Sequence, residues 1–138
     1  MKTFIVISAL SIACQFSFGQ GLKKDNLFGV HVITVSVKPG ATIEEFSLFF
    51  VKEVLPEYEK HWTGLKGYLL KSARGEYKDT FAIMWLFESE KIRDSYFNSD
   101  GTPNSDELKA LEKVKPVEEK LSKYGTYTVK YMDDWVVQ

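Results

Sequence analysis

The stretch GVHVITVSV, residues 29–37, decides the fold, because it is a predicted β-strand with two largely apolar faces. The segment Lys38-Pro39-Gly40 ends the strand. Side chains of a strand alternate between its two faces. One face carries His31, Ile33, Val35 and Val37, and the other carries Val30, Val32, Thr34 and Ser36. A single layer of helices can cover only one of these faces.

The segments that follow predict the element order β-α-β-β-α-β. A capping box at residues 42–45 begins a helix with Phe46 and Phe50 on its apolar stripe, and Pro56 ends or kinks that helix. Strands are predicted over residues 65–74 and 80–88, joined around Gly75, and over residues 126–132. Between the last two strands, the turn-rich residues 98–105 divide a short helix after Ser89 from a longer helix over residues 106–123.

This order indicates an α+β, ferredoxin-like sandwich with an antiparallel four-stranded sheet. Helices cover one face of such a sheet and leave the other face bare. Because both faces of these strands are substantially apolar, a second surface must cover the bare one, and a symmetric partner is the simplest. The sequence therefore predicts a homodimer in the form of an α/β barrel.

The N-terminus has the pattern of a signal peptide over residues 1–19. Lys2 precedes the apolar run of residues 4–13, which is too short to span a bilayer, and small residues at Ser17 and Gly19 predict cleavage after Gly19. A linker over residues 20–26 and one domain over residues 27–138 would follow. The chain is then expected to be exported, as a periplasmic or secreted protein whose only cysteine leaves with the signal.

An alternative interpretation of the N-terminus rests on Cys14. The sequence LSIAC, residues 10–14, partly matches a lipoprotein box, in which the cysteine is acylated and anchors the chain. Contact with a membrane is expected only in that case.

Charge and motifs exclude several function classes. The 138 residues carry a net charge of -1, and the longest basic run is the pair Lys23-Lys24, so no nucleic-acid partner is expected. The sequence lacks a Gly-Xaa-Ser-Xaa-Gly elbow, a phosphate-binding loop, a dinucleotide fingerprint and a zinc-protease pair. His31 and His61 have no metal-ligand spacing, so neither a metal nor a cofactor is expected.

Residues 31–40 resemble the first-strand signature of the stress-responsive dimeric A/B barrel proteins, in which a histidine opens an alternating apolar strand that ends in lysine. The likeness continues at Glu44-Glu45-Phe46, at Phe87-Glu88-Ser89 and at Tyr96. The antibiotic-biosynthesis monooxygenase-like proteins share this architecture. The chain thus resembles the dimeric α/β-barrel superfamily over residues 30–131.

The resemblance implies a pocket between sheet and helices, and in some members cofactor-free oxygenase or polyketide cyclase activity. In the cyclase-like members a strand histidine and a helix tyrosine, matched here by His31 and Tyr96, act with a second histidine. Thr102 stands at the position of that second histidine, so the proton-handling partner is missing. The second helix also lacks the histidine that binds haem in the haem-degrading members.

The residues themselves also suggest where a ligand would lie. Phe81, Ile83 and Trp85 share one face of a strand, and would form an apolar wall if that face is also the face of His31. His31 and Tyr96 are the candidate catalytic residues. The predicted lining comprises His31, Ile33, Val35, Phe46, Phe50, Tyr68, Phe81, Ile83, Trp85 and Tyr96. The alternative is that these side chains form plain core or dimer interface.

Four further expectations concern polar and terminal residues. His61 is expected to cap a helix at the surface, and Asp133-Asp134 to form a solvated turn. The pairs Glu44-Glu45 and Glu118-Glu119 are expected on solvated helix surfaces. The apolar tail, residues 135–137, is expected to dock on its own domain or across the dimer.

Two functions remain open from the sequence. The first is a dimer that binds or transforms a small, largely apolar or aromatic molecule, with His31 as the polar anchor. The second is a non-enzymatic envelope protein whose barrel serves assembly or partner binding. An enclosed cavity between sheet and helices would favour the first, and an interior filled by side chains would favour the second.

Overall fold

The computed structural model describes residues 21–131 and 133–138. The predicted signal peptide, its cleavage site and Cys14 lie outside these residues. Among the described residues, no helix combines the length and the hydrophobicity that crossing a bilayer requires.

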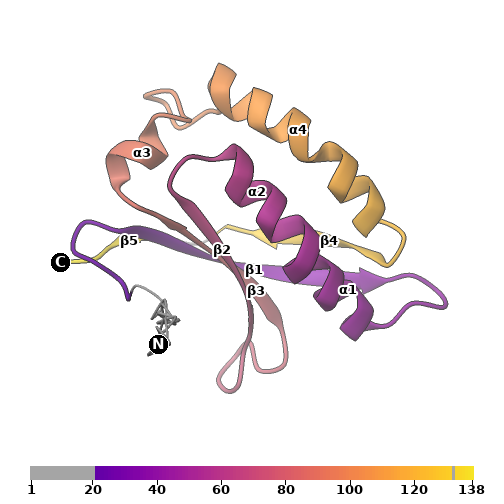
Figure 1. Ribbon diagram of the computed structural model, residues 1–138. Coiled ribbons are helices and arrows are strands. Elements are labelled where there is room, and N and C mark those ends of the chain that lie inside the picture. The colour runs from indigo at the N-terminus through magenta and orange to yellow at the C-terminus, as the bar shows by residue number, and fades with distance from the viewer. Residues whose placement is uncertain (1–20, 132) are drawn as a thin grey trace, which may run out of the picture.

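The chain folds into one sheet with a layer of helices on one side of it (Figure 1). The strands are β1 (Leu27–Val37), β2 (Leu65–Lys71), β3 (Phe81–Phe87), β4 (Gly125–Lys130) and β5 (Asp134–Val136). The helices are α1 (Ile43–Phe49), the π-helix η1 (Phe50–Val54), α2 (Leu55–His61), α3 (Glu90–Asp94) and α4 (Ser105–Leu121).

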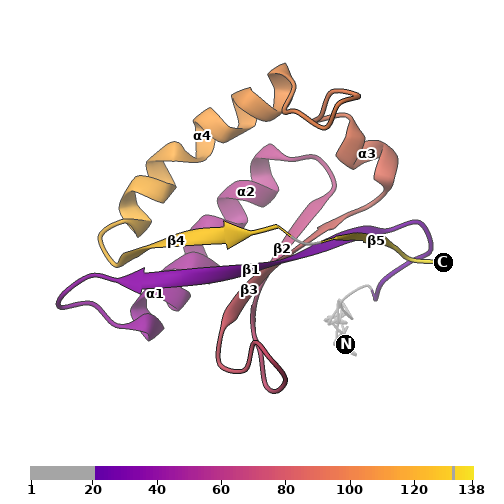
Figure 2. The same cartoon turned by 180° about the vertical axis from the view of Figure 1, so that it is seen from behind.

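The strands lie in the order β2-β3-β1-β4, and every pair is antiparallel. This order is the ferredoxin-like one, so the predicted fold class is confirmed. The prediction of four strands was incomplete, because β5 pairs with the beginning of β1. β4 and β5 therefore follow one another along the same edge of β1 (Figure 2). The expectation that the tail docks on its own domain is confirmed by this pairing.

The first helical segment begins as the sequence predicts and then departs from regular α-helix. Thr42 accepts a hydrogen bond from the backbone of Glu45, whose carboxylate accepts one from the backbone of Thr42. Pro56 has no N–H to donate to the carbonyl four residues before it. The preceding turn opens into η1, in which the N–H of Leu55 reaches the carbonyl of Phe50. Pro56 thus ends one helical stretch and lies in the first turn of the next, α2.

The second helical region is divided as predicted. Ser89 caps α3 by accepting a hydrogen bond from the backbone of Ile92. After a turn-rich connection, Asn104 caps α4 by accepting from the backbone of Asp106 and of Glu107. The caps fix where the two helices start, and α4 then crosses the sheet above α2 (Figure 1).

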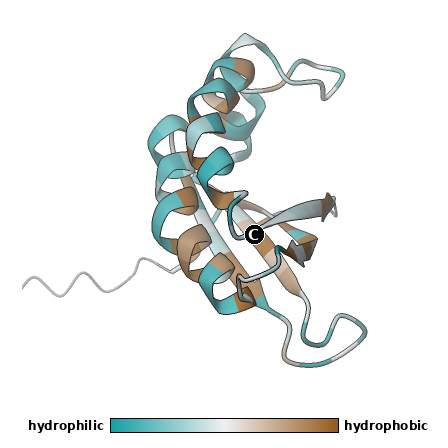
Figure 3. Cartoon of the chain, turned by 90° about the vertical axis from the view of Figure 1, so that its right-hand side faces the viewer, coloured by the Kyte–Doolittle hydropathy of each residue, from teal (hydrophilic) through white to brown (hydrophobic). Residues whose placement is uncertain are grey.

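Two apolar clusters join the helices to the sheet. The larger one contains fully buried Phe46, Phe50 and Val54 from the helices, packed on Ile33 of β1 and Ile83 of β3. The smaller one lies nearer α3 and contains Trp62, Leu65, Tyr96, Ala110 and Val114. Viewed along the sheet edge, all helices lie on one side (Figure 3). The helices therefore cover the sheet face that carries Ile33 and Ile83.

The buried face of the helical segment allows a direct test of this packing. We expect Phe50→Ala to lower the free energy of unfolding by about 3–5 kcal/mol, because it leaves a cavity in a core that excludes solvent from Phe50 entirely. Leu48→Ala, at a side chain that is 55% exposed, should change it by less than about 0.5 kcal/mol. Urea denaturation followed by circular dichroism measures both. Equal losses in the two variants would contradict the assigned helix face.

Candidate functional site

The side chains predicted to form an apolar ligand wall do share one sheet face, but in this structure they pack in the hydrophobic core. Ile83 pairs directly with His31, so the strand face of Phe81, Ile83 and Trp85 is the face of His31, as the sequence suggested. Ile33, Phe46 and Phe50 are buried against it, with the rings of Phe46 and Phe50 stacked 6.0 Å apart. The partly buried Val35, Phe81 and Trp85 pack on the same cluster. These side chains contact one another and fill the space in which a ligand was predicted.

Tyr68 is a correction to the predicted lining. It pairs with Met84, one residue out of phase with Ile83, so its side chain lies on the sheet face away from the helices. It is 43% exposed there. The period-two alternation along β2 decides this placement, because Gly67 and Leu69 occupy the helix-facing positions.

Tyr96 lies just after α3 and is nearly buried. Its hydroxyl accepts a hydrogen bond of 2.7 Å from the backbone N–H of Thr63, and its ring packs near Trp62 and Phe87. His31 instead packs edge-on against Tyr131, with ring centroids 5.1 Å apart. The two candidate catalytic residues therefore have different partners. The hydrogen bond between Tyr96 and Thr63 holds the start of β2 in place.

His31 lies at an irregularity in the sheet. On the edge of β1, Val32 pairs with Lys130 and Gly29 pairs with Asp134. The edge pairing of β1 is therefore interrupted beside residues 30 and 31, between the pairing with β4 and the pairing with β5. The His31 ring is on the helix-facing side at this gap between β4 and β5.

Gly29 makes room for the polar atoms at this gap. A Cβ on Gly29 would lie 2.8 Å from Nε2 of His31 and 2.5 Å from Oδ1 of Asp134. Both atoms therefore lie over the Gly29 backbone, where any side chain would displace them. The Asp134 carboxylate is also 3.6 Å from Nη2 of Arg93. We call His31, Asp134 and Tyr131 with the Gly29 backbone the His31 site.

The protonation of His31 follows from its surroundings. Burial lowers the pKa of the His31 imidazole, and the charge of Asp134 opposes that shift. The ring is therefore neutral at neutral pH, with one nitrogen as donor and the other as acceptor. Its Nδ1 is buried and has no hydrogen-bond partner among the described residues. An unpaired buried nitrogen costs about 1–3 kcal/mol.

Sequence analysis missed a partly buried carboxylate. Glu118 was expected on a solvated helix surface, and this was wrong: its Oε1 accepts hydrogen bonds of 3.1 Å from the hydroxyls of both Tyr58 and Tyr127. Burial raises the pKa of Glu118, and burial also raises the pKa of both tyrosines. The sequence signal that indicates this placement is spacing. Glu118 is four residues after Val114 and three before Leu121, and both of these residues are buried.

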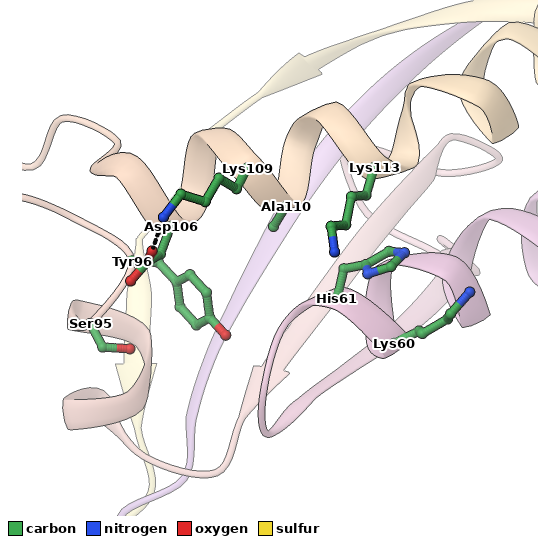
Figure 4. A pocket seen from close by; sticks show the side chains of 8 residues that line it. All are labelled: Lys60, His61, Ser95, Tyr96, Asp106, Lys109, Ala110 and Lys113. Carbon is green, nitrogen blue, oxygen red and sulfur yellow. Dashed lines mark hydrogen bonds and ion pairs between the residues drawn. The ribbon is translucent and has the colours of Figure 1, made fainter.

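The remaining polar expectations are mixed. Asp134 is not in a solvated turn but in β5, beside His31. His61 does lie at the end of α2, where its Nε2 is 2.8 Å from Oε1 of Glu57. It lines an open pocket of about 420 Å³ between α2, α3 and α4 (Figure 4). Within residues 21–131 and 133–138, no group of three or more histidine, cysteine, aspartate or glutamate side chains could hold a metal ion.

Comparison with known proteins finds structural likeness only. No family model and no curated protein matches the sequence. The chain is similar to SnoaB, a cofactor-independent oxygenase from Streptomyces nogalater, with 17% identity over 79% of this chain and 92% of that one, and a TM-score of 0.43. It is also similar to a NIPSNAP family protein of unknown function from Agrobacterium tumefaciens, with 14% identity over 78% of this chain and 86% of that one, and a TM-score of 0.46. The ferredoxin-like assignment rests on the strand order given above.

The charge of Asp134 partly offsets the effect of burial on the pKa of His31. We expect Asp134→Asn to lower the pKa of His31 further, because it removes the charge that opposes desolvation. Asp133→Asn, at the exposed neighbouring residue, should leave that pKa unchanged. An NMR titration of the imidazole resonances measures both. An unchanged His31 pKa in Asp134→Asn would show that the two groups do not interact.

The lowered pKa of His31 also determines how the contribution of this residue to folding stability depends on pH. The folded-state pKa of His31 lies below its ordinary value of 6.5, so the unfolded chain binds the proton more readily. This contribution to stability is complete above pH 6.5 and falls as the pH drops from there toward the folded-state pKa.

Proposed function

We propose that this chain is one subunit of a homodimeric α/β barrel, and that assembly through its uncovered sheet face is its primary function. One observation carries the proposal: the sheet face away from the helices carries a group of neighbouring apolar side chains. We call this set of residues the open sheet face. Its members are Phe28, Val30, Val32, Tyr68, Leu70, Ala82, Met84, Leu86 and Trp135.

The strand register brings these side chains together. Met84 lies at the centre, between Tyr68 on β2 and Val30 on β1. The rows on either side of Met84 are built around Leu86 and Ala82. Side chains directly opposite on neighbouring strands lie within about 5.5 Å, so the rows form one continuous patch. A patch of this kind on a soluble domain marks an interaction surface.

A second copy of the chain suits this patch better than a charged partner. The strand positions on this face include no acidic residue, and the lysines Lys66 and Lys130 lie at its rim, where they can reach solvent. A two-fold axis would stack two such faces at the spacing of about 10 Å that packed sheets adopt. No buried charge would then be left unpaired.

The filled interior also favours assembly over a ligand held between sheet and helices. The aromatic side chains of the larger cluster occupy that space in the single chain. A second candidate function, binding of a small, largely apolar or aromatic molecule, is favoured by the unpaired Nδ1 of His31. Cofactor-free oxygenase- or cyclase-like chemistry would then depend on His31 and its neighbour Tyr131, because the hydroxyl of Tyr96 is bonded to Thr63 and not to His31.

Oligomeric state tests the proposed assembly. We expect the purified chain to be a dimer at micromolar concentration by light scattering, and Met84→Glu to weaken association about thirtyfold or more, because it buries a charge at the centre of the interface. Leu108→Glu is the matched control, since Leu108 is an exposed leucine on α4, and it should remain a dimer. Circular dichroism shows that each variant is folded. A monomeric parent chain, or a folded Met84→Glu variant that dimerises as the parent does, would refute the proposal.

We also propose that residues 1–19 direct export and are then removed. Mass spectrometry of protein from the extracytoplasmic fraction of a bacterial host should give the mass of a chain that begins at Gln20. A lipid-modified chain that begins at Cys14 would instead support the anchored alternative. An uncleaved chain would contradict both.

A further inference from the structure

The open pocket between the helices has a different chemical character from the sheet. Lys60 and His61 reach it from the end of α2, Ser95 and Tyr96 from the segment after α3, and four residues from α4 (Figure 4). The α4 residues are Asp106, Lys109, Ala110 and Lys113. Their spacing of three and four residues places them on one face of the helix.

Ala110 and Tyr96 form the buried part of the pocket wall. Ala110 is 5% exposed, and Tyr96 is nearly buried. Ala110 also belongs to the smaller apolar cluster, so the pocket adjoins the core there. The pocket volume of about 420 Å³ lies within the range of small-molecule sites.

The charges around the pocket are unbalanced toward positive. Asp106 is the one acidic residue in its lining, and it pairs with Lys109 at 3.1 Å. Glu57, outside the lining, pairs with Lys60 at 3.2 Å and with His61 at 2.8 Å. Lys113 has no hydrogen-bond or ion-pair partner within the described part of the chain. Figure 4 shows its ammonium group directed across the pocket toward the His61 ring.

The two α4 lysines also face the same space. Lys109 and Lys113 are four residues apart, and like charges at this spacing destabilise a helix slightly. An anion between them would remove that repulsion and give Lys113 the partner it lacks. Tyr96 can add a hydrogen bond, because its hydroxyl accepts from Thr63 and keeps its own proton to donate.

We propose that this pocket binds a small phosphorylated molecule, with its phosphate monoester held by Lys113 and Lys109 beside His61. Lysine ammonium groups bind phosphate as point charges, which suits a compact dianion. The pocket is large enough for a small organic group attached to the phosphate. This site is separate from the open sheet face and from the His31 site, and it does not depend on the proposed dimer.

Titration with inorganic phosphate and with glycerol phosphate, followed by NMR, tests this site. Both should shift the Ala110 amide and the His61 imidazole resonances saturably at pH 7.5, whereas sodium chloride at equal ionic strength and glycerol should not. Lys113→Gln should weaken binding about three- to tenfold, as expected for loss of one charged hydrogen bond.

Lys115→Gln is the matched control, because Lys115 lies on the same helix but pairs with Glu112 outside the pocket lining. It should leave the affinity unchanged. The absence of saturable shifts with either phosphate, or equal weakening by both lysine variants, would overturn the proposal. Shifts that sodium chloride reproduces would do the same, because they would reflect ionic strength alone.

Discussion

The burial of one face of β1 beneath the helices is the constraint on which the rest of this structure depends. Ile33 packs under Phe46 and Phe50, and this contact fixes which alternate residues of the strand point inward. A shift of one residue in the pairing would turn Val32 toward the helices and His31 to the outside. The helices cover only this face, so the apolar side chains of the other face remain uncovered in the single chain.

Filling the interior determines where polar chemistry can occur. The helix–sheet space holds packed aromatic rings, and the carboxylate of Glu118 accepts hydrogen bonds there from Tyr58 and Tyr127. Polar atoms without such partners lie at the margins. His31 is at the gap between β4 and β5, and Lys113 faces the pocket between helices. Under the proposed function the sheet face serves assembly, and the pocket beside Lys113 is the proposed small-molecule site.

Local sequence signals predicted most of the fold. The capping box at Thr42, the cap at Ser89 and the strand alternation around Ile33 depend on neighbours in the chain, and all three are found. The predictions that were wrong or incomplete depend on contacts between segments that are distant in the chain. The burial of Glu118 needs tyrosines from α2 and β4, and the pairing of β5 needs the free edge of β1 beyond β4. The site was only partly predictable, because the position of His31 on the inner face follows from alternation, whereas its contact with Tyr131 depends on how β4 and β5 follow one another along β1.

The contact between two copies across the sheet can be measured directly. In a dimer formed from equal parts of ¹³C-labelled and unlabelled chain, isotope-filtered NOE spectra detect only protons of different copies that lie close together. The account predicts intermolecular NOEs to the methyl group of Met84, which lies at the centre of the open sheet face. NOEs between copies that involve only helix residues such as Leu108, with none at Met84, would contradict it.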